Sequence, residues 1–489
     1  MARSRVRFSR PVSLLVVALL AAVLASGGPV AAQDQLPPGG NFVDDDGDIH
    51  EAAIEAIRAE GITVGCAPTR YCPNDPVTRG QMAAFLDRAL DLPDATTPSG
   101  FTDTTGTFFT NIERLRAAGI TVGCGATIYC PDRPVTRGEM ATFLTRALDL
   151  EPLMPEPRAL PSAGNPDGTA PIPAGGGAED TSSSDRVIGN GSPASCTSAA
   201  VVTAVAAGGT ITFDCGPNPI TIEMLETARV FNNADPDIVI DGGGLVTLSG
   251  MGERRILYMN TCDPDLVWTT SHCQNQDHPR LTVQNLTFIE GDATGEGIDL
   301  GGGGGAIWVR GGRFKIVNSR FFDNHCAPTG PDVAGGAVRV FSQFEGLPVF
   351  VTNSTFGAEG QGNTCSNGGA MSSIGVSMTF TNSLLTHNEA IGFGANPQRA
   401  GTPGGGNGGA IANDGNTYTL TVRDTVITDN TANEGGGGIF YVSNDRSGNL
   451  VIDASELARN PSLGFETAGL PGIFYLGSGP ALVTDSALS

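Results

Sequence analysis

Apolar residues in the first 150 positions recur with helical spacing in two segments that carry the same start signal. Thr78 precedes Gln81 by three positions, and Thr136 precedes Glu139 by three. This is the spacing of a capping box, in which two side chains satisfy the free backbone N–H groups of a helix start. Apolar residues then follow at intervals of three and four, as on the buried face of an amphipathic helix. With a shorter helical stretch ahead of each capped helix, the pattern predicts helix, loop and capped helix, twice.

The two segments are copies of one repeat. Residues 61–92 and 119–150 are identical at 24 of 32 aligned positions, and each copy is preceded by a Phe-x-Asp start at 42–44 or 101–103. Such self-similarity indicates a repeat architecture. We therefore expect a small α-helical domain of two repeats, about 42–92 and 101–150, within residues 33–150.

Beyond residue 186 the helical period gives way to short β-rich segments separated by Gly and Asn. A glycine pair followed by alternating apolar residues recurs about every thirty positions, at 304–307, 335–338, 368–371, 408–411 and 437–440. A second marker keeps phase with it, and Asn324, Asn388, Asn430 and Asn460 close several units. One unit of this size cannot bury its apolar face alone, but stacked units can.

The repeat predicts a solenoid of parallel strands over residues 186–489, in roughly nine coils. Apolar residues should point inward, and Asn at equivalent turns should adopt left-handed geometry and bond its copy on the next coil. The glycine pairs should mark corners where a side chain would clash. Residues 198–205 read as a short helix that covers the open end, which solenoids require.

Two further segments lack either pattern. Residues 1–32 carry four arginines, a short apolar run and an Ala-x-Ala-like end, which is the order of a secretory signal peptide. No later apolar run is long enough to cross a bilayer, so we expect no membrane span in the mature chain. Residues 151–185 are rich in Pro, Gly, Ser and Ala without apolar periodicity, the composition of a flexible linker.

The ten cysteines fit an exported chain, because oxidising compartments favour disulfides. Their spacing favours five local pairs, although sequence alone does not fix connectivity. A zinc site built from the first four thiolates is the alternative. The favoured pairs are Cys66/Cys72, Cys124/Cys130, Cys196/Cys215, Cys262/Cys273 and Cys326/Cys365.

Composition and charge limit the partners. The chain has 28 basic and 51 acidic residues and a formal net charge of −23. This is the wrong sign for binding a phosphate backbone, so nucleic acid is excluded as a partner. We expect neither a cofactor nor a metal, since no motif with the spacing of a known site occurs.

The N-terminal repeats resemble the S-layer homology repeat: Phe-x-Asp, then Gly-Ile-Thr-x-Gly, then Val-Thr-Arg and an amphipathic helix. The resemblance implies anchoring to anionic cell-wall polysaccharide through a Thr-Arg-Ala-Glu-like turn. That role falls on Arg79 and Arg137, with Thr78 and Thr136 as caps, because an Arg fork at a helix start can hold carboxylates. A solvated first-turn arginine is the alternative.

Two departures from the family pattern bear on this resemblance. The turn reads Thr-Arg-Gly-Gln in the first copy and Thr-Arg-Gly-Glu in the second. Two copies are present where the family usually assembles three.

The C-terminal repeats look like those of pectate-lyase-like proteins, and residues 321–324 are similar to the polymorphic outer-membrane protein repeat. The resemblance implies a right-handed single-stranded parallel β-helix. For a hydrolase of that group we would expect neighbouring carboxylates with a His nearby, but residues 186–489 contain no Asp-Asp pair and no Gly-His-Gly. A lyase needs a cation or an Arg/Lys cluster beside the uronate carboxylate, for which Arg310, Arg313, Arg320 and Arg339 are candidates.

One outward position suggests carbohydrate binding. Aligning the glycine pairs places Trp308 over Arg339 on the outer side, because Ile307 and Val309 alternate inward. An indole beside Arg339 and Arg310 is a candidate sugar-stacking patch. A half-exposed Trp packed on an Arg stem is the alternative.

The sequence therefore predicts an exported protein at the cell surface, in the cell wall or S-layer. The helical repeats would bind cell-wall polysaccharide, and the solenoid would bind extracellular glycans or act in adhesion, without catalysis. A secreted polysaccharide lyase and a purely structural surface-layer component are the alternatives.

Overall fold

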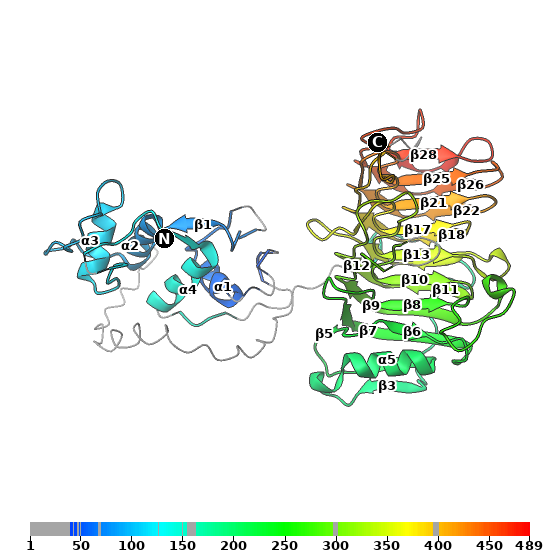
Figure 1. Ribbon diagram of the computed structural model, residues 1–489, viewed down its shortest axis with the longest axis horizontal. Coiled ribbons are helices and arrows are strands. Elements are labelled where there is room, and N and C mark those ends of the chain that lie inside the picture. Colours follow the sequence, from blue (N-terminus) through cyan, green and yellow to red (C-terminus); the bar gives the residue numbers. More distant parts are fainter. Residues whose placement is uncertain are drawn as a thin grey trace, which may run out of the picture. The chain divides into compact units, whose positions relative to one another are not determined.

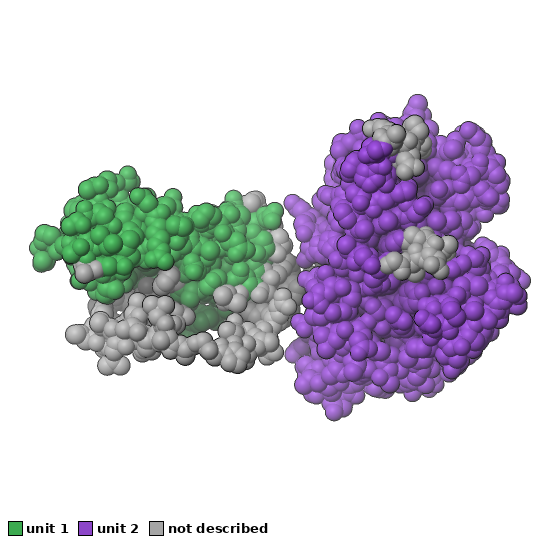
Figure 2. Space-filling view, in the orientation of Figure 1, with its two compact units in different colours: residues 1–160 green, residues 161–489 purple. Residues whose placement is uncertain are grey.

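The computed structural model describes residues 40–42, 44–45, 48, 50–66, 70–125, 127–148, 150–153, 163–296, 302–394 and 401–489. The predicted signal peptide, residues 1–32, lies outside these ranges. The chain divides into two compact units, residues 1–160 and residues 161–489 (Figure 2). Among the described residues, no helix has the length and apolar character needed to span a bilayer.

The first unit is built from the two repeats, each a helix, a loop and a second helix as predicted. The repeats exchange contacts: the first helix of one copy packs against the second helix of the other. A short antiparallel strand pair joins them, with Val77 opposite Val135. The elements are α1 (Glu51–Ala59), β1 (Pro76–Thr78), α2 (Arg79–Leu90), α3 (Phe109–Ala117), β2 (Pro134–Thr136) and α4 (Arg137–Ala147).

This reciprocal packing explains the glycine in the Thr-Arg-Gly turns. Gly80 lies against Phe108 of the other repeat, and a Cβ there would be 2.5 Å from the Phe108 ring. At the equivalent place, a Cβ on Gly138 would be 2.6 Å from the His50 ring. Such distances are well inside van der Waals contact, so the departure from the family motif follows from the close approach of the two copies.

Gly80→Ala is therefore expected to destabilise the first unit by about 1–2 kcal/mol, through overpacking against Phe108. Thermal unfolding of the full chain measures this cost. In a Phe108→Ala background the space is open, and the same substitution should become neutral or slightly stabilising, as alanine is the better helix former. An equal cost in both backgrounds would refute the packing explanation.

All ten cysteines form the five predicted disulfides. The bridges are Cys66–Cys72, Cys124–Cys130, Cys196–Cys215, Cys262–Cys273 and Cys326–Cys365. The first four cysteines are thus paired, and the alternative of a zinc site built on their thiolates is not supported.

The second unit is mainly β, and its strands stack in parallel rows along one axis (Figure 1). The front sheet contains β6 (Ala228–Val230), β8 (Leu257–Asn260), β10 (Ile307–Arg310), β13 (Val338–Phe341), β17 (Met371–Ile374), β21 (Ile411–Gly415), β25 (Ile439–Ser443) and β28 (Ile473–Leu476). The second row contains β3 (Arg186–Gly189), β4 (Gly209–Asp214), the start of β7 (Asp237–Ser249), the start of β9 (Arg280–Ile289), β11 (Arg313–Val317), β14 (Val349–Thr352), β18 (Met378–Thr381), β22 (Thr419–Arg423), β26 (Asn449–Asp453) and β29 (Leu482–Thr484).

The third row continues from the second around a bend. It contains β5 (Ile220–Glu223), the ends of β7 and β9, β12 (Arg320–Phe322), β15 (Thr355–Phe356), β19 (Leu384–Thr386), β23 (Val426–Thr428), β27 (Glu456–Ala458) and β30 (Ala487–Leu488). A small sheet adds β16 (Thr364–Cys365), β20 (Glu389–Ala390) and β24 (Thr431–Ala432). Short 3₁₀ helices are η2 (Pro193–Ser195), η3 (Cys273–Asn275) and η4 (Phe344–Gly346). The chain visits the rows in turn, so this unit is a solenoid of parallel strands.

From Ile307 to Ile411 the register of the front sheet is the one that the glycine pairs predict. At the last pair, 437–440, the prediction is off by one residue, because Ile411 pairs with Ile439 and not with Phe440. Ile307 pairs with Val338, which pairs with Met371 on the next coil. In the first four pairs the second glycine stands where backbones meet: a Cβ on Gly336 would lie 2.2 Å from the carbonyl oxygen of Gly369. The glycines therefore mark corners with no room for a side chain.

Aligned asparagines form a buried ladder through the interior. The Asn363 side chain donates to Asn388 Oδ1 (2.8 Å), and Asn388 donates to Asn430 Oδ1 (2.9 Å). Asn324 and Asn460 extend the ladder at its two ends. On another turn, Asn318 adopts φ 50° and its amide donates to Asn285 Oδ1. Both predicted roles of asparagine, the left-handed turn and the bond between coils, are thus confirmed.

The end nearest the N-terminus of the solenoid carries the predicted helix, α5 (Ser198–Ala207). Thr197 caps it by accepting a hydrogen bond from the Ala200 N–H, and Val201 and Val205 are buried in the main core. At the other end, residues after Leu476 continue the second and third rows as β29 and β30.

Residues 163–185, here called the strap, lie against the outside of the solenoid. The sequence predicts a flexible linker over 151–185, and for this part the prediction is wrong. Composition gave no sign of the outward side chains that hold the strap. The contacts run from Asn165 with Asn382 and Asp424, through Lys315 with Gly177 and Glu179, to Thr181 with Asp241 and Asp185 with Thr210.

Candidate functional site

Each of the two predicted arginines rests on a tyrosine of the other repeat. The Arg79 guanidinium lies 4.8 Å from the centre of the Tyr129 ring, and that of Arg137 lies 4.6 Å from the Tyr71 ring. The Nε–H groups donate to the backbone carbonyls of the same tyrosines, at 3.0 and 2.8 Å. The tyrosine hydroxyls donate back to the arginine carbonyls, each at 3.0 Å. The two arginines are therefore held in a fixed, related geometry.

The tyrosines keep their protons. Burial raises the pKa of Tyr71 to about 12, against the opposing effect of the Arg137 charge. Burial likewise raises the pKa of Tyr129, with Arg79 again opposing it. Each hydroxyl thus remains a donor throughout the physiological range.

These contacts leave the outer nitrogens of both arginines available. Within the described part of the chain, neither Arg79 nor Arg137 forms an ion pair, and of their side-chain nitrogens only Nε donates a hydrogen bond. Both side chains are partly exposed. Thr78 and Thr136 instead use their hydroxyls as caps, accepting from the N–H groups of Gln81 and Glu139. The threonines position the turns, and the arginines present donors.

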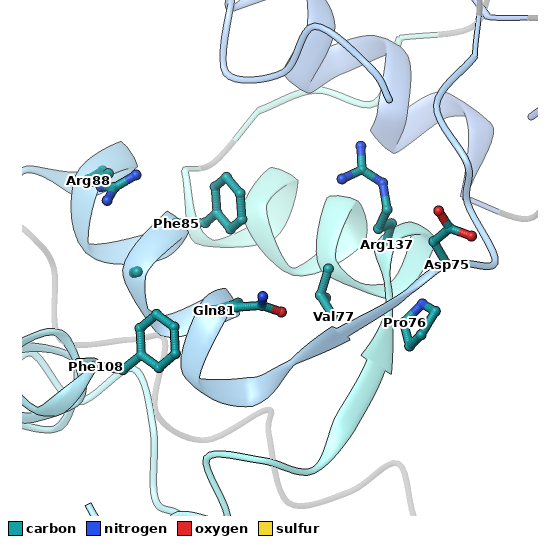
Figure 3. A pocket seen from close by; sticks show the side chains of 9 residues that line it. Asp75, Pro76, Val77, Gln81, Phe85, Arg88, Phe108 and Arg137 are labelled. Carbon is teal, nitrogen blue, oxygen red and sulfur yellow. The ribbon is translucent and has the colours of Figure 1, made fainter. Parts of the chain in front are cut away.

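Arg137 lines a groove of about 520 Å³ on the first unit (Figure 3). Gln81, Phe85 and Arg88 of α2 line it too, and Phe108 closes one side. Phe85 is 37% exposed rather than buried on the helix face. The lining thus combines two guanidinium groups and apolar ring surface, which suit an acidic sugar, with the carboxylate of Asp75, which does not.

The repeat places a second set of residues at the equivalent positions around Arg79. There Glu139 takes the place of Gln81, and His50 takes the place of Phe108. The Nδ1 atom of His50 lies 2.7 Å from the Thr142 hydroxyl. The two faces therefore differ in charge although the arginines match.

Sequence reasoning missed the tyrosines that orient the arginines and the other residues lining the groove. A signal was present for the tyrosines: Tyr71 and Tyr129 occupy the same position in both copies. The other groove residues come from both repeats, so only the packing of the two copies shows that they meet.

On the solenoid, the predicted carbohydrate patch is not exposed. Trp308 pairs with Arg339 in the predicted register and faces away from the main core, but Trp308 is 0% exposed and Arg339 is 3% exposed. The prediction of a surface patch is wrong because the loop between β8 and β9 covers it. Leu266 of that loop packs with Trp308, Tyr258 and Phe341. Arg310 remains half-buried.

Adjacent coils also bring together ionisable groups that are distant in sequence. Phe322 pairs with Ile289, which places Asp323 beside Glu290, and Asp292 pairs with His325. Burial, together with the Glu290 charge, raises the pKa of Asp323 to about 7. Burial lowers the pKa of His325, while Asp292 and Glu290 oppose this. The absence of an Asp-Asp pair in the sequence therefore did not exclude neighbouring carboxylates.

Asp323→Asn is expected to stabilise the solenoid at alkaline pH. The folded-state pKa lies above the ordinary value near 3.8, so the wild type loses stability as pH rises from about 4 through 7, when the half-buried Asp323 must ionise. Asparagine removes that cost and tolerates the left-handed φ of 51°. We expect a gain of about 1–2 kcal/mol at pH 8 and none at pH 4, measured by denaturant unfolding.

Asp485→Asn is the matched control, because Asp485 is exposed and has a similar φ of 48°. It should give no pH-dependent gain. Equal effects of the two substitutions at pH 8 would contradict the burial argument.

Comparison with known proteins identifies the class of the first unit. The S-layer homology domain matches residues 44–83 and 100–141, one match in each repeat. The N-terminal unit is therefore a pair of S-layer homology repeats. Repeats of this kind mark proteins anchored at the cell surface, and this chain is accordingly a cell-surface protein.

Two curated proteins share a short segment with the chain. The amylopullulanase of Thermoanaerobacterium thermosulfurigenes is 34% identical over 99 residues, which is 20% of this chain and 5% of that protein. The endoglucanase of Bacillus sp. (strain KSM-635) is 29% identical over 96 residues, 20% of this chain and 10% of its own. The chain thus matches only a small part of either relative. No solved structure matches it.

Proposed function

We propose that the protein is anchored in the cell wall through its two S-layer homology repeats, with Arg79 and Arg137 binding anionic wall polysaccharide. The observation that carries this proposal is the pair of arginines fixed on Tyr129 and Tyr71 with their outer nitrogens unengaged. A planar fork with paired donors matches the geometry of a carboxylate. Thr78 and Thr136 hold the two turns that carry the forks.

The proposal extends to residues 186–489 of the second unit, as a right-handed parallel β-helix that presents a surface for carbohydrate binding or adhesion. Three parallel rows, each visited once per coil, support this fold. Export, with cleavage of residues 1–32, belongs to the same proposal. Extracellular glycans are the proposed partners of the solenoid.

Sedimentation with purified wall polysaccharide tests the anchoring function. The full chain should co-sediment, and added free polysaccharide should release it. Failure to co-sediment at low and moderate salt would end the anchoring proposal. A glycan array then tests the solenoid, and an assay for unsaturated uronate products tests the alternative of a lyase: turnover would replace adhesion by catalysis.

A further inference from the structure

Two of the five disulfides belong to the first unit, and each closes a short loop in one repeat. Cys66–Cys72 and Cys124–Cys130 each join residues six positions apart. In both loops the second cysteine directly follows the tyrosine on which an arginine of the other repeat rests. These two bridges are therefore next to the proposed polysaccharide site, whereas the other three lie in the solenoid.

The first loop positions the arginine of the second repeat through Tyr71. The Tyr71 ring is buried and lies 4.6 Å from the Arg137 guanidinium. The Tyr71 carbonyl accepts from Arg137 Nε at 2.8 Å, and the Tyr71 hydroxyl donates to the Arg137 carbonyl at 3.0 Å. A shift of this loop would therefore reach Arg137 directly. The second loop is linked to Arg79 in the same way, through Tyr129.

The backbone at the end of each loop has an unfavourable conformation. Cys72 has φ 60° and Cys130 has φ 59°. Residues other than glycine seldom adopt this left-handed region, and they persist there only where the surrounding contacts hold them. The bridge fixes the side chain of the second cysteine and so offsets the cost. Once the bridge is open, each cysteine can relax to a right-handed or extended conformation and move the tyrosine before it.

A carboxylate holds the same part of each loop. Asp44 accepts from the Tyr71 N–H at 2.7 Å and from the Cys72 N–H at 2.9 Å, and Asp103 holds the second loop equivalently. An Asp44 oxygen and the two sulfurs of the first bridge lie within 4.8 Å of one another. The cation that faces Asp44 is Arg70, at 3.6 Å and 62% exposed. A thiolate formed beside Asp44 would be repelled by it, so opening the bridge also disturbs the group that holds Tyr71.

Both bridges of the first unit are accessible from solvent. Cys66 is exposed, and the other three cysteines of these bridges are partly exposed. In the solenoid, by contrast, the cysteines of Cys196–Cys215 and Cys326–Cys365 are buried. Thiol–disulfide exchange needs access to a sulfur atom, and exposed bridges are the ones that open readily. A reductant should therefore open the bridges of the first unit before these two.

We propose that the wall anchor is redox-sensitive: a dithiol reductant opens Cys66–Cys72 and Cys124–Cys130, and the protein then releases the wall polysaccharide. This inference rests on the proposed function of Arg79 and Arg137 and adds the regulation of that site. Opening a bridge frees the second cysteine from its left-handed conformation. The tyrosine before it shifts, and the arginine fork loses the fixed position in which it binds a carboxylate.

The redox step is a thiol–disulfide exchange. One thiolate of the reductant attacks a sulfur of the bridge, which breaks the S–S bond and leaves a mixed disulfide and one protein thiolate. The second thiolate of the reductant then displaces the other protein sulfur. The protein gains two electrons and takes up two protons on its sulfurs, and the reductant is oxidised to its own disulfide. Reoxidation reverses the change.

Co-sedimentation of the full chain with purified wall polysaccharide, at increasing concentrations of dithiothreitol, tests this inference. Alkylation of free thiols and peptide mass mapping show which bridges are open at each concentration. Binding should weaken about tenfold as the two bridges of the first unit open, and it should return on reoxidation. Circular dichroism at each step checks that the solenoid stays folded.

Two variants separate the bridge from the reductant. The first opens both bridges permanently by the substitutions Cys66→Ser, Cys72→Ser, Cys124→Ser and Cys130→Ser. It should bind about tenfold more weakly than the oxidised wild type. The second variant has Cys72→Gly and Cys130→Gly in place of the corresponding serines. It should bind within about threefold of the oxidised wild type, because glycine adopts positive φ without steric cost.

The matched control opens a partly exposed bridge of the solenoid, by Cys262→Ser with Cys273→Ser. Its binding should equal that of the wild type, and a comparable loss there would mean that opening any bridge weakens binding by general destabilisation. Equal losses in the serine and glycine variants would overturn the coupling through the left-handed cysteines.

The outcomes also separate this inference from the function on which it rests. An oxidised wild type that does not co-sediment would reject the anchoring function itself. Oxidised and reduced chains that bind equally, with the thiols of both bridges shown to be free, would overturn the redox inference and leave the anchoring function in place.

Discussion

The full chain carrying Arg79→Ala and Arg137→Ala is expected to lose its sedimentation with purified wall polysaccharide. Each arginine offers paired donors to a carboxylate, and such charge-assisted bonds contribute about 1.5–3 kcal/mol each. Losing both should therefore cost about 3 kcal/mol or more, which is about a hundredfold in affinity. A co-sedimentation isotherm at fixed ionic strength measures the loss, because surface electrostatic attraction weakens with salt.

Arg58 and Arg116 provide a matched control for this experiment. They too sit near aromatic rings, 5.9 Å from Phe42 and 5.6 Å from Phe101, and each donates to a backbone carbonyl. Arg58→Ala with Arg116→Ala removes the same charge and the same kinds of contact without touching the two turns. Equal losses in both double variants would show that net charge, rather than the fixed forks, drives binding.

Asn388→Ala is expected to destabilise the solenoid by about 3–5 kcal/mol. Asn388 is fully buried in the middle of the ladder; its amide donates to Asn430 Oδ1 and to the Phe356 carbonyl, and its Oδ1 accepts from Asn363. Alanine leaves several buried groups without partners, at about 1–3 kcal/mol each. Denaturant unfolding followed by circular dichroism measures the change.

The corresponding control is Asn433→Ala. Asn433 is exposed, and within the described residues its side chain makes one hydrogen bond, to the Ile391 carbonyl, so the loss of that side chain should cost less than about 0.5 kcal/mol. Similar costs at the two positions would mean that the asparagine ladder adds little stability beyond that of the paired strands. In a solenoid each coil is stabilised by its neighbours, so weakening the contact between two coils can separate the unfolding of the coils on either side. A second unfolding step confined to the C-terminal coils would therefore be consistent with the prediction.

The sequence predicted those parts of the fold that repeat. The glycine pairs gave the register from Ile307 to Ile411, because a side chain at the second glycine would meet the next backbone. The last pair was placed one residue too late, because three glycines follow one another at 436–438. The recurring asparagines predicted the buried asparagine ladder. Residues at the same place in each repeat come to lie above one another on successive coils. The capped helices followed from Thr78 and Thr136, whose partners lie only three residues away.

Features that depend on a single insertion or on contact between copies could not be predicted in this way. Trp308 was placed on the correct side of the sheet, yet its exposure depends on Leu266, which lies in a loop with no counterpart in other coils. The groove around Arg137 joins residues of both repeats, and no spacing within one copy shows that Phe108 meets Gly80. The strap could not be predicted either. Its own composition is that of a linker, and the partners that hold it, such as Asp424, lie far along the chain.

The strap determines where mechanical load would reach the solenoid. It first contacts the solenoid near Asp424 and then runs back, coil by coil, to Thr210. Tension arriving from the wall side would therefore act on the flank of the stack and break the strap contacts in succession, beginning at Asn165. Sequential rupture spreads the force over time, so the strap could lengthen under shear and leave the coils themselves intact.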